Sequence, residues 1–269
     1  MSYWTKWRPA WVLLMCWAFH AGAFASTCTK SVRWYDDGAY SFRGADGQPT
    51  GLYVELVREA LRRMDCSVQW QEMPWARGLV ELEAGKLDIL PGARKTPERD
   101  KFAYFSRPLN RSPNVLFMSK AASQRFQFTR LADMVGTDFK LGVQLGVAYG
   151  AEYDELIKNP EFLARAQALT SRRSAWSLLQ IGRLDGLISD EVTAWVELQS
   201  LGLSTTVVRT RVVTSDDPGL LALSRLSNTV EFVAALDRTL QTMIADGSYK
   251  RIREKFVPCV TSAETLSCR

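Results

Sequence analysis

The stretch Gly85-Lys-Leu-Asp-Ile-Leu-Pro-Gly-Ala-Arg-Lys-Thr-Pro-Glu-Arg99 decides the fold prediction. A helix is expected to end at its first glycine, and a short buried strand, Leu87–Leu90, follows before a break at Pro91-Gly92. Thr96-Pro-Glu98 has the pattern of a helix N-cap, first position and acidic first turn. Free N–H groups at such a start, together with the planar fork of Arg99, suit a carboxylate. The stretch predicts a carboxylate site at the end of a strand, where open α/β sheets bind ligands. The alternative is a strand and turn followed by a solvated arginine.

The N-terminal region has the features of a secretory signal peptide. Lys6 and Arg8 are followed by an apolar run, and Ala23-Phe-Ala25 has the small-x-small pattern that precedes cleavage. We expect cleavage after Ala25, which removes residues 1–25 and places the mature chain in the periplasm. A lipid anchor at Cys16 is the less favoured alternative.

The composition of the mature chain, after removal of the signal peptide, excludes several classes of function. The chain has one histidine, His20, and it lies in the removed segment. The mature chain therefore has no His-dependent catalytic triad and no histidine metal site. Lys plus Arg falls from 34 to 32 against 29 acidic residues, a charge of about +3 without basic runs. This composition gives no support for nucleic-acid binding, and the motifs indicate neither a metal nor a cofactor.

Four cysteines remain in the mature chain, and an even number in an exported protein favours disulfides. Cys28 and Cys66 each precede an expected strand, so parallel neighbouring strands would bring them together. Cys259 and Cys268 would then close a short C-terminal loop. Three pairings are possible, and this one is favoured.

Short apolar strands alternate with amphipathic helices along the mature chain, which is typical of an α/β fold with mostly parallel sheets. The pattern of helix, glycine stop and short strand occurs twice, at Gly85–Leu90 and at Gly182–Asp190. Two lobes that face each other across a cleft are the natural interpretation.

The order of these pieces resembles the bacterial extracellular solute-binding proteins of family 3, the periplasmic receptors typified by polar amino-acid transport. The motifs that carry the resemblance are Tyr40-Ser-Phe42 with Asp46–Gly51, Pro74-Trp75, Gly85–Asp88 through Thr96–Arg99 and Phe105-Ser106, Leu141–Gly146, Gly182–Asp185 through Asp190-Glu191, and Ala245–Phe256.

The resemblance implies a two-lobe periplasmic binding protein fold of type II. Residues 26–115 and 218–269 would form lobe 1, and residues 116–217 would form lobe 2. Two crossing strands near Asn114–Met118 and Val212–Ser215 would serve as the hinge.

The resemblance also implies roles for particular residues. Arg99 would clamp the α-carboxylate of the ligand, Asp190 would hold its α-amino group, and Trp75 would form an aromatic wall. The remaining predicted ligand-site residues are Gly92, Thr96, Tyr40, Arg94, Arg77 and Gly146. Phe42 is an alternative to Tyr40 on the aromatic side.

Two departures from the family's pattern bear on the ligand. Val147-Ala148 stands where a hydroxyl residue usually follows Gly146, and Arg94 stands where a small or hydroxyl residue is usual. With Arg77 also near the cleft, three arginines would favour a ligand with more than one anionic group. The alternative is that Arg77 and Arg94 are solvated or paired with acidic neighbours.

The expected function is capture of a small carboxylate-bearing ligand, most simply a polar amino acid, by a monomer that delivers it to an inner-membrane ABC permease. One alternative is a ligand-sensing adaptor for a membrane receptor. The other is an exported lyase of the same fold, which would need Glu191 or Glu72 as a general acid with a raised pKa. The favoured prediction is a binding protein, not an enzyme.

Overall fold

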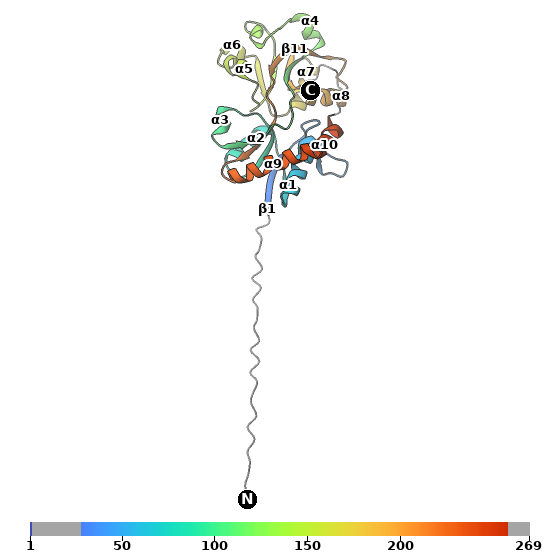
Figure 1. The fold of residues 1–269 in the computed structure, drawn as a ribbon. Coiled ribbons are helices and arrows are strands. Elements are labelled where there is room, and N and C mark those ends of the chain that lie inside the picture. The colour runs from blue at the N-terminus through green and yellow to red at the C-terminus, as the bar shows by residue number, and fades with distance from the viewer. Residues whose placement is uncertain (2–27, 258–269) are drawn as a thin grey trace.

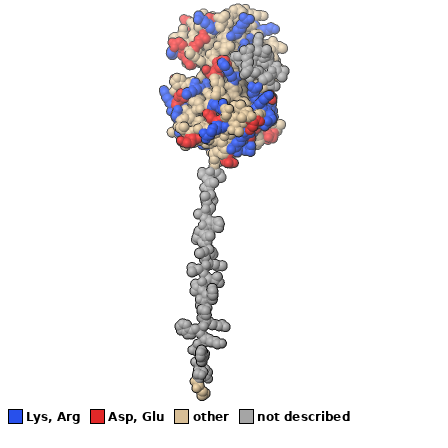
Figure 2. All heavy atoms as spheres, in the orientation of Figure 1, with Lys and Arg blue, Asp and Glu red and all other residues tan. Residues whose placement is uncertain are grey.

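The computed structural model describes residue 1 and residues 28–257, which fold into two lobes, each built on a five-stranded sheet (Figure 1). The expected signal peptide and the expected Cys259–Cys268 pairing lie outside the described residues. Among the described residues, no helix is both long and apolar enough to cross a membrane. Basic and acidic side chains are interspersed on the face seen in Figure 2.

Lobe 1 is the part built on the sheet with strand order β4-β1-β5-β12-β6. Strands β4 and β5 run parallel to β1, whereas β12 is antiparallel to both β5 and β6. The elements of this lobe are β1 (Cys28–Trp34), β2 (Phe42–Arg43), β3 (Pro49–Thr50), α1 (Leu52–Arg63), β4 (Cys66–Glu72), α2 (Trp75–Glu83), β5 (Ile89–Ala93), α3 (Pro97–Asp100), β6 (Ala103–Phe105), β12 (Leu220–Ser224), α9 (Val230–Ala245) and α10 (Ser248–Phe256).

Lobe 2 is built on the sheet with strand order β11-β7-β10-β8-β9. Strands β8 and β10 are parallel, as are β8 and β9, while β7 is antiparallel to β10 and β11. Both sheets are therefore mixed. The elements are β7 (Asn114–Ser119), α4 (Lys120–Arg125), the 3₁₀ helix η1 (Leu131–Met134), β8 (Leu141–Gln144), α5 (Ala151–Leu156), α6 (Pro160–Leu163), β9 (Ala166–Leu169), α7 (Arg172–Gln180), β10 (Gly186–Asp190), α8 (Glu191–Ser200) and β11 (Val207–Ser215).

The chain passes between the lobes twice, before β7 and after β11. The two crossing segments contact each other through a bridge between Asn110 and Gly219. Helix α8 also reaches across, since its buried Val192 packs with the lobe 1 core. The crossing segments are thus paired with each other, and side-chain packing of α8 adds a contact between the lobes.

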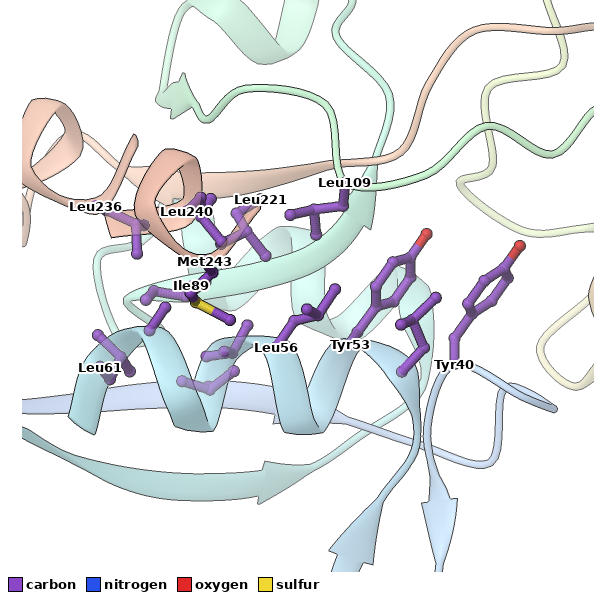
Figure 3. Packing of buried hydrophobic residues seen from close by; sticks show 14 of the residues in the cluster. Tyr40, Tyr53, Leu56, Leu61, Ile89, Leu109, Leu221, Leu236, Leu240 and Met243 are labelled. Carbon is purple, nitrogen blue, oxygen red and sulfur yellow. The ribbon is translucent and has the colours of Figure 1, made fainter. Parts of the chain in front are cut away.

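The lobe 1 core shows why α1 forms where it does. Leu56 and Leu61 of this helix are almost completely buried and face Ile89 of β5, and α9 covers the same cluster (Figure 3). Burial of each such side chain contributes about 1.5–3 kcal/mol.

The disulfide between Cys28 and Cys66 is present, as predicted. The two cysteines are partners in the parallel register of β1 and β4, with Cα atoms 4.5 Å apart. The physical reason is the one anticipated, because parallel neighbouring strands that start in register bring their first residues together.

The predicted chain break at Pro91-Gly92 is wrong. Strand β5 continues through both residues to Ala93, with Pro91 in register with Leu221 of β12. A register shift beside this pair and the left-handed φ of +82° at Gly92 accommodate the proline within the sheet. A Cβ at Gly92 would lie 2.7 Å from the Tyr53 ring, so the glycine also allows close packing.

Candidate functional site: a charged cavity between the lobes

A cavity lies between the lobes, where the carboxyl ends of strands from both sheets meet. Residues at or just beyond the ends of β1, β5, β8 and β10 line it, among them Asp37, Arg94, Gln144 and Asp190. The cavity has a volume of about 110 Å³. A cavity of this size and position suits a small polar molecule held by both lobes.

Arg99 lines this cavity from lobe 1 and is 7% exposed. Thr96 caps the short α3 by accepting a hydrogen bond from the Arg99 backbone N–H at 3.3 Å, which confirms the predicted N-cap. The Arg99 guanidinium donates to the Arg94 carbonyl oxygen at 2.7 Å and to the Gly146 carbonyl oxygen at 2.8 Å. A guanidinium has five N–H donors, so donors remain for a ligand carboxylate.

Burial, assisted by the nearby Arg94 cation, lowers the pKa of Arg99 to about 10. The side chain therefore remains positively charged at neutral pH. The structure contains no ion pair between Arg99 and a carboxylate of the described residues. An incoming carboxylate would supply this missing counter-charge.

Trp75 lines the cavity beside Arg99, with the guanidinium carbon 5.8 Å from the ring centroid. Its indole N–H donates to the Gly146 carbonyl oxygen at 3.0 Å, so one lobe 2 carbonyl accepts hydrogen bonds from two lobe 1 side chains. The Arg33 guanidinium lies 5.4 Å from the same indole ring. The aromatic wall predicted at Trp75 is thus flanked by two cations.

Asp190 lines the cavity from lobe 2, at the end of β10. Its Oδ1 accepts a hydrogen bond from the Thr193 N–H at 2.9 Å, which caps α8. Its Oδ2 accepts from the Tyr40 hydroxyl at 3.3 Å. Burial and the Asp190 charge raise the pKa of Tyr40, so this hydroxyl stays protonated and donates to the carboxylate. Asp190 is therefore both a helix cap and a negative group in the cavity.

Tyr40 extends from the lobe 1 core toward this carboxylate. Its ring stacks on Tyr53 with the centroids 4.5 Å apart, and both hydroxyl oxygens lie at the same side of the core cluster (Figure 3). The Asn110 side chain connects the two, accepting from the Tyr53 hydroxyl and donating to the Tyr40 oxygen. Phe42 instead packs edge-on against Phe256.

Arg94 lines the cavity but is held by the chain crossings. It donates to the Ser215 hydroxyl at 2.6 Å and to the Ser112 carbonyl oxygen at 3.1 Å. Asp217, 3.7 Å away, is 70% exposed and so is a weak, solvent-screened partner. Arg94 thus links the cavity to both crossing segments.

Three predicted site residues lie outside the cavity wall. Arg77 projects from α2, is 64% exposed and pairs with Glu81. The prediction that Arg77 lies in the cleft is therefore wrong. Helical spacing explains the pairing, because positions i and i+4 are neighbours on one helix face, so the exposed Arg77 reaches back to the buried Glu81. Thr96 and Gly146 act through Arg99, as a cap and as an acceptor of its hydrogen bond. Gly92, by contrast, lines the cavity.

The two glutamates considered as general acids are not among the cavity-lining residues. Glu72 pairs with Arg43 and is 48% exposed. Glu191 is buried and pairs with Arg209 of β11. Neither carboxyl is placed to protonate a molecule held between the lobes.

Sequence reasoning missed a group of charged residues in the cavity, Asp37 with Arg33 and Arg172. Asp37, just after β1, accepts a hydrogen bond from Arg33 Nη1 at 2.6 Å and lies 3.6 Å from Arg172 Nη2 of lobe 2. All three line the cavity. The sequence did contain one indication of this group. Arg33 stands between the apolar residues Val32 and Trp34 in β1, and an arginine in a buried strand needs a partner.

Comparison with known proteins agrees with this arrangement. Residues 35–258 match the family described as bacterial extracellular solute-binding proteins, family 3. The chain belongs to this family. A curated relative, ABC transporter arginine-binding protein 1 of Escherichia coli (strain K12), is 24% identical over 224 residues, covering 80% of this chain and 84% of the relative.

Solved structures share the fold. A histidine kinase sensor domain with similarity to periplasmic binding proteins is 20% identical, with a TM-score of 0.73 over 86% of this chain and 96% of that one. The ancestral amino acid-binding protein AncCDT-1, a precursor of cyclohexadienyl dehydratase, is 25% identical, with a TM-score of 0.68 over 85% and 95%. The fold is that of the type II periplasmic binding proteins, and the family's common role is solute binding.

Proposed function

We propose that this protein is a periplasmic solute-binding protein that captures a polar amino acid and delivers it to an ABC-type importer. The observation that carries the proposal is that Arg99 of lobe 1 and Asp190 of lobe 2 line the same cavity. A positive and a negative group on opposite lobes suit a zwitterion. Each lobe would gain a charge-assisted contact only when both enclose the same ligand.

In this proposal the Arg99 guanidinium holds the α-carboxylate and the Asp190 carboxylate holds the α-amino group. Trp75 covers the ligand's apolar part, and Gly92 contributes backbone to the cavity wall. The names of two curated relatives, an ABC transporter arginine-binding protein and an L-cystine-binding protein, support the proposed ligand class.

A thermal-shift screen of the mature chain tests this proposal. The panel contains the twenty amino acids and, for comparison, simple dicarboxylates without an amine. We expect at least one amino acid to raise the melting temperature, because a ligand present at 100 times its Kd stabilises the folded state by about 2.7 kcal/mol. Stabilisation by dicarboxylates alone would contradict the zwitterion proposal.

The same fold serves a sensor domain, so sensing is the second candidate role. Gene order distinguishes the two. Adjacent permease and ATPase genes support transport, whereas an adjacent sensor kinase gene supports signalling. The ligand chemistry proposed above is the same in both cases.

A further inference from the structure

Asp37 carries two arginine partners that come from different lobes. Arg33 belongs to β1 of lobe 1, is 3% exposed and donates to Asp37 Oδ2. Arg172 begins α7 of lobe 2, and its Nη2 lies 3.6 Å from Asp37 Oδ1. Burial would raise the pKa of Asp37, but the two guanidinium charges overcome this and lower it. The carboxylate is therefore negative and already neutralised by protein groups.

Arg172 is held in this place by a second set of contacts. Its Nε donates to the Glu197 carboxylate at 3.1 Å and its Nη1 donates to the Gln144 side-chain oxygen at 3.0 Å. Glu197 is 4% exposed and also accepts from the Trp176 indole at 2.6 Å. These partners orient the Arg172 guanidinium toward the cavity and Asp37.

Two other groups at this part of the cavity have donors to offer. Arg33 Nη2 is buried and has no hydrogen-bond partner among the described residues. The Tyr149 hydroxyl oxygen accepts from the Gln144 N–H at 2.8 Å, so its own hydrogen is available to another acceptor. Both residues line the cavity. This region thus presents positive charge and donors to a ligand, rather than a free carboxylate.

We infer that Arg172 is a specificity-determining residue that occupies, next to Asp37, the position a cationic ligand side chain would need. The cavity consequently rejects basic amino acids and takes an amino acid whose side chain accepts hydrogen bonds, a carboxamide or a carboxylate. This inference rests on the proposed function and specifies its ligand. The physical reason is that a third cation beside Asp37 would face two like charges with one counter-charge.

The test compares L-arginine with L-glutamine by calorimetry on the mature protein. The parent is expected to bind L-glutamine at least about tenfold more tightly than L-arginine. The double variant Arg172→Gln/Glu197→Gln frees Asp37 without leaving Glu197 as an unpaired buried charge. It is expected to gain about tenfold or more in affinity for L-arginine.

Arg173→Gln is the matched control. Arg173 is adjacent in sequence and lies 3.9 Å from Asp36, but both members of that pair are more than half exposed and neither lines the cavity. This control should keep the parent's ratio of affinities. A parent that binds L-arginine as tightly as L-glutamine, or a double variant that gains no affinity for L-arginine, would overturn the inference.

A second variant tests the inference at Asp37, without a substitution at Arg172. Asp37→Asn removes the counter-charge between the two arginines, so the preference for L-glutamate over L-glutamine should rise about tenfold, while Asp36→Asn leaves it unchanged. An unchanged preference in Asp37→Asn contradicts the inference. If the parent binds no amino acid, the proposed function fails, and the L-arginine titration of the double variant still decides the role of Arg172.

Discussion

The Arg99 guanidinium of lobe 1 donates a 2.8 Å hydrogen bond to the Gly146 carbonyl oxygen of lobe 2. The residue proposed to hold the ligand carboxylate is thus also a direct link between the lobes. Gly146 follows β8 with a left-handed φ of +79°, a conformation that glycine adopts without the strain of a side chain. Ligand binding and lobe contact are therefore coupled at one side chain.

Arg99→Ala should reduce the affinity for the best amino acid of the screen by thirtyfold or more. Loss of a desolvated charge-assisted contact costs about 2–5 kcal/mol. Since Arg99 is buried, the variant should also lose some stability, in contrast to an exposed arginine. Calorimetry measures the affinity. Arg77→Ala is the control, because this exposed arginine pairs with Glu81 outside the cavity, and its affinity should equal the parent's. Parent-like binding by Arg99→Ala would refute the carboxylate clamp.

Asp190→Asn separates the charge of this residue from its role as a helix cap. The amide oxygen can still accept from the Thr193 N–H, so α8 should stay intact. Amine-bearing ligands should bind about tenfold more weakly or worse, whereas dicarboxylates without an amine should be affected much less. Asp185→Asn is the control, since Asp185 accepts from the Lys140 N–H at the other end of β10. Equal losses for both ligand classes would argue against an amine contact.

Removal of the Cys28–Cys66 disulfide should destabilise the protein by about 2–4 kcal/mol. The two residues are 38 positions apart, and the bond restricts the unfolded chain. Urea unfolding of the Cys28→Ser/Cys66→Ser variant measures the loss. Peptide mapping without reduction tests the remaining prediction, a linked peptide that contains Cys259 and Cys268. A peptide that joins Cys66 to either of these would contradict the pairing.

Protonation of Asp37 should lower the free energy of unfolding at acidic pH. Its pKa in the folded protein is below the ordinary 3.8, because the Arg33 and Arg172 charges outweigh the effect of burial. Its contribution is therefore fully present above about pH 4 and is lost as the pH falls through the lower folded value. Urea unfolding at pH 7 and pH 3 should reveal a smaller acid-induced loss in Asp37→Asn than in the parent. The Asp36→Asn control should behave like the parent, and identical losses in all three proteins would contradict this role.

Gly38→Ala should prevent the lobes from meeting as they do here. Gly38 has a φ of +62°, and a Cβ there would lie 2.7 Å from the Thr193 Cγ2 of lobe 2. We expect weaker ligand binding and a larger radius of gyration in small-angle scattering. Gly47→Ala is matched for backbone strain, with a φ of +79° and no atom within 4 Å of the added Cβ. If Gly38→Ala affects binding no more than Gly47→Ala does, the contact has no role in closure.

The sequence was sufficient for the features that depend on local pattern. Apolar periodicity, glycine stops and the Thr96-Pro97 start predicted the alternating elements, and the strand starts at Cys28 and Cys66 predicted their disulfide. Such features depend on neighbours in the chain or on a single strand register. The family resemblance, and not local pattern, directed attention to Arg94 and Asp190, and both line the cavity.

Tertiary structure alone decided which charged residues face one another. Arg172 and Asp37 are far apart in the chain, and no periodicity relates them, yet the lobes bring them to the same cavity. Arg77, close to Trp75 in sequence, instead projects to solvent and pairs with the buried Glu81. The passage of β5 through Pro91 likewise depended on its pairing with β12. Local pattern determines which segments form helices and strands, whereas the partner of a charge depends on packing between segments that the sequence does not place in space.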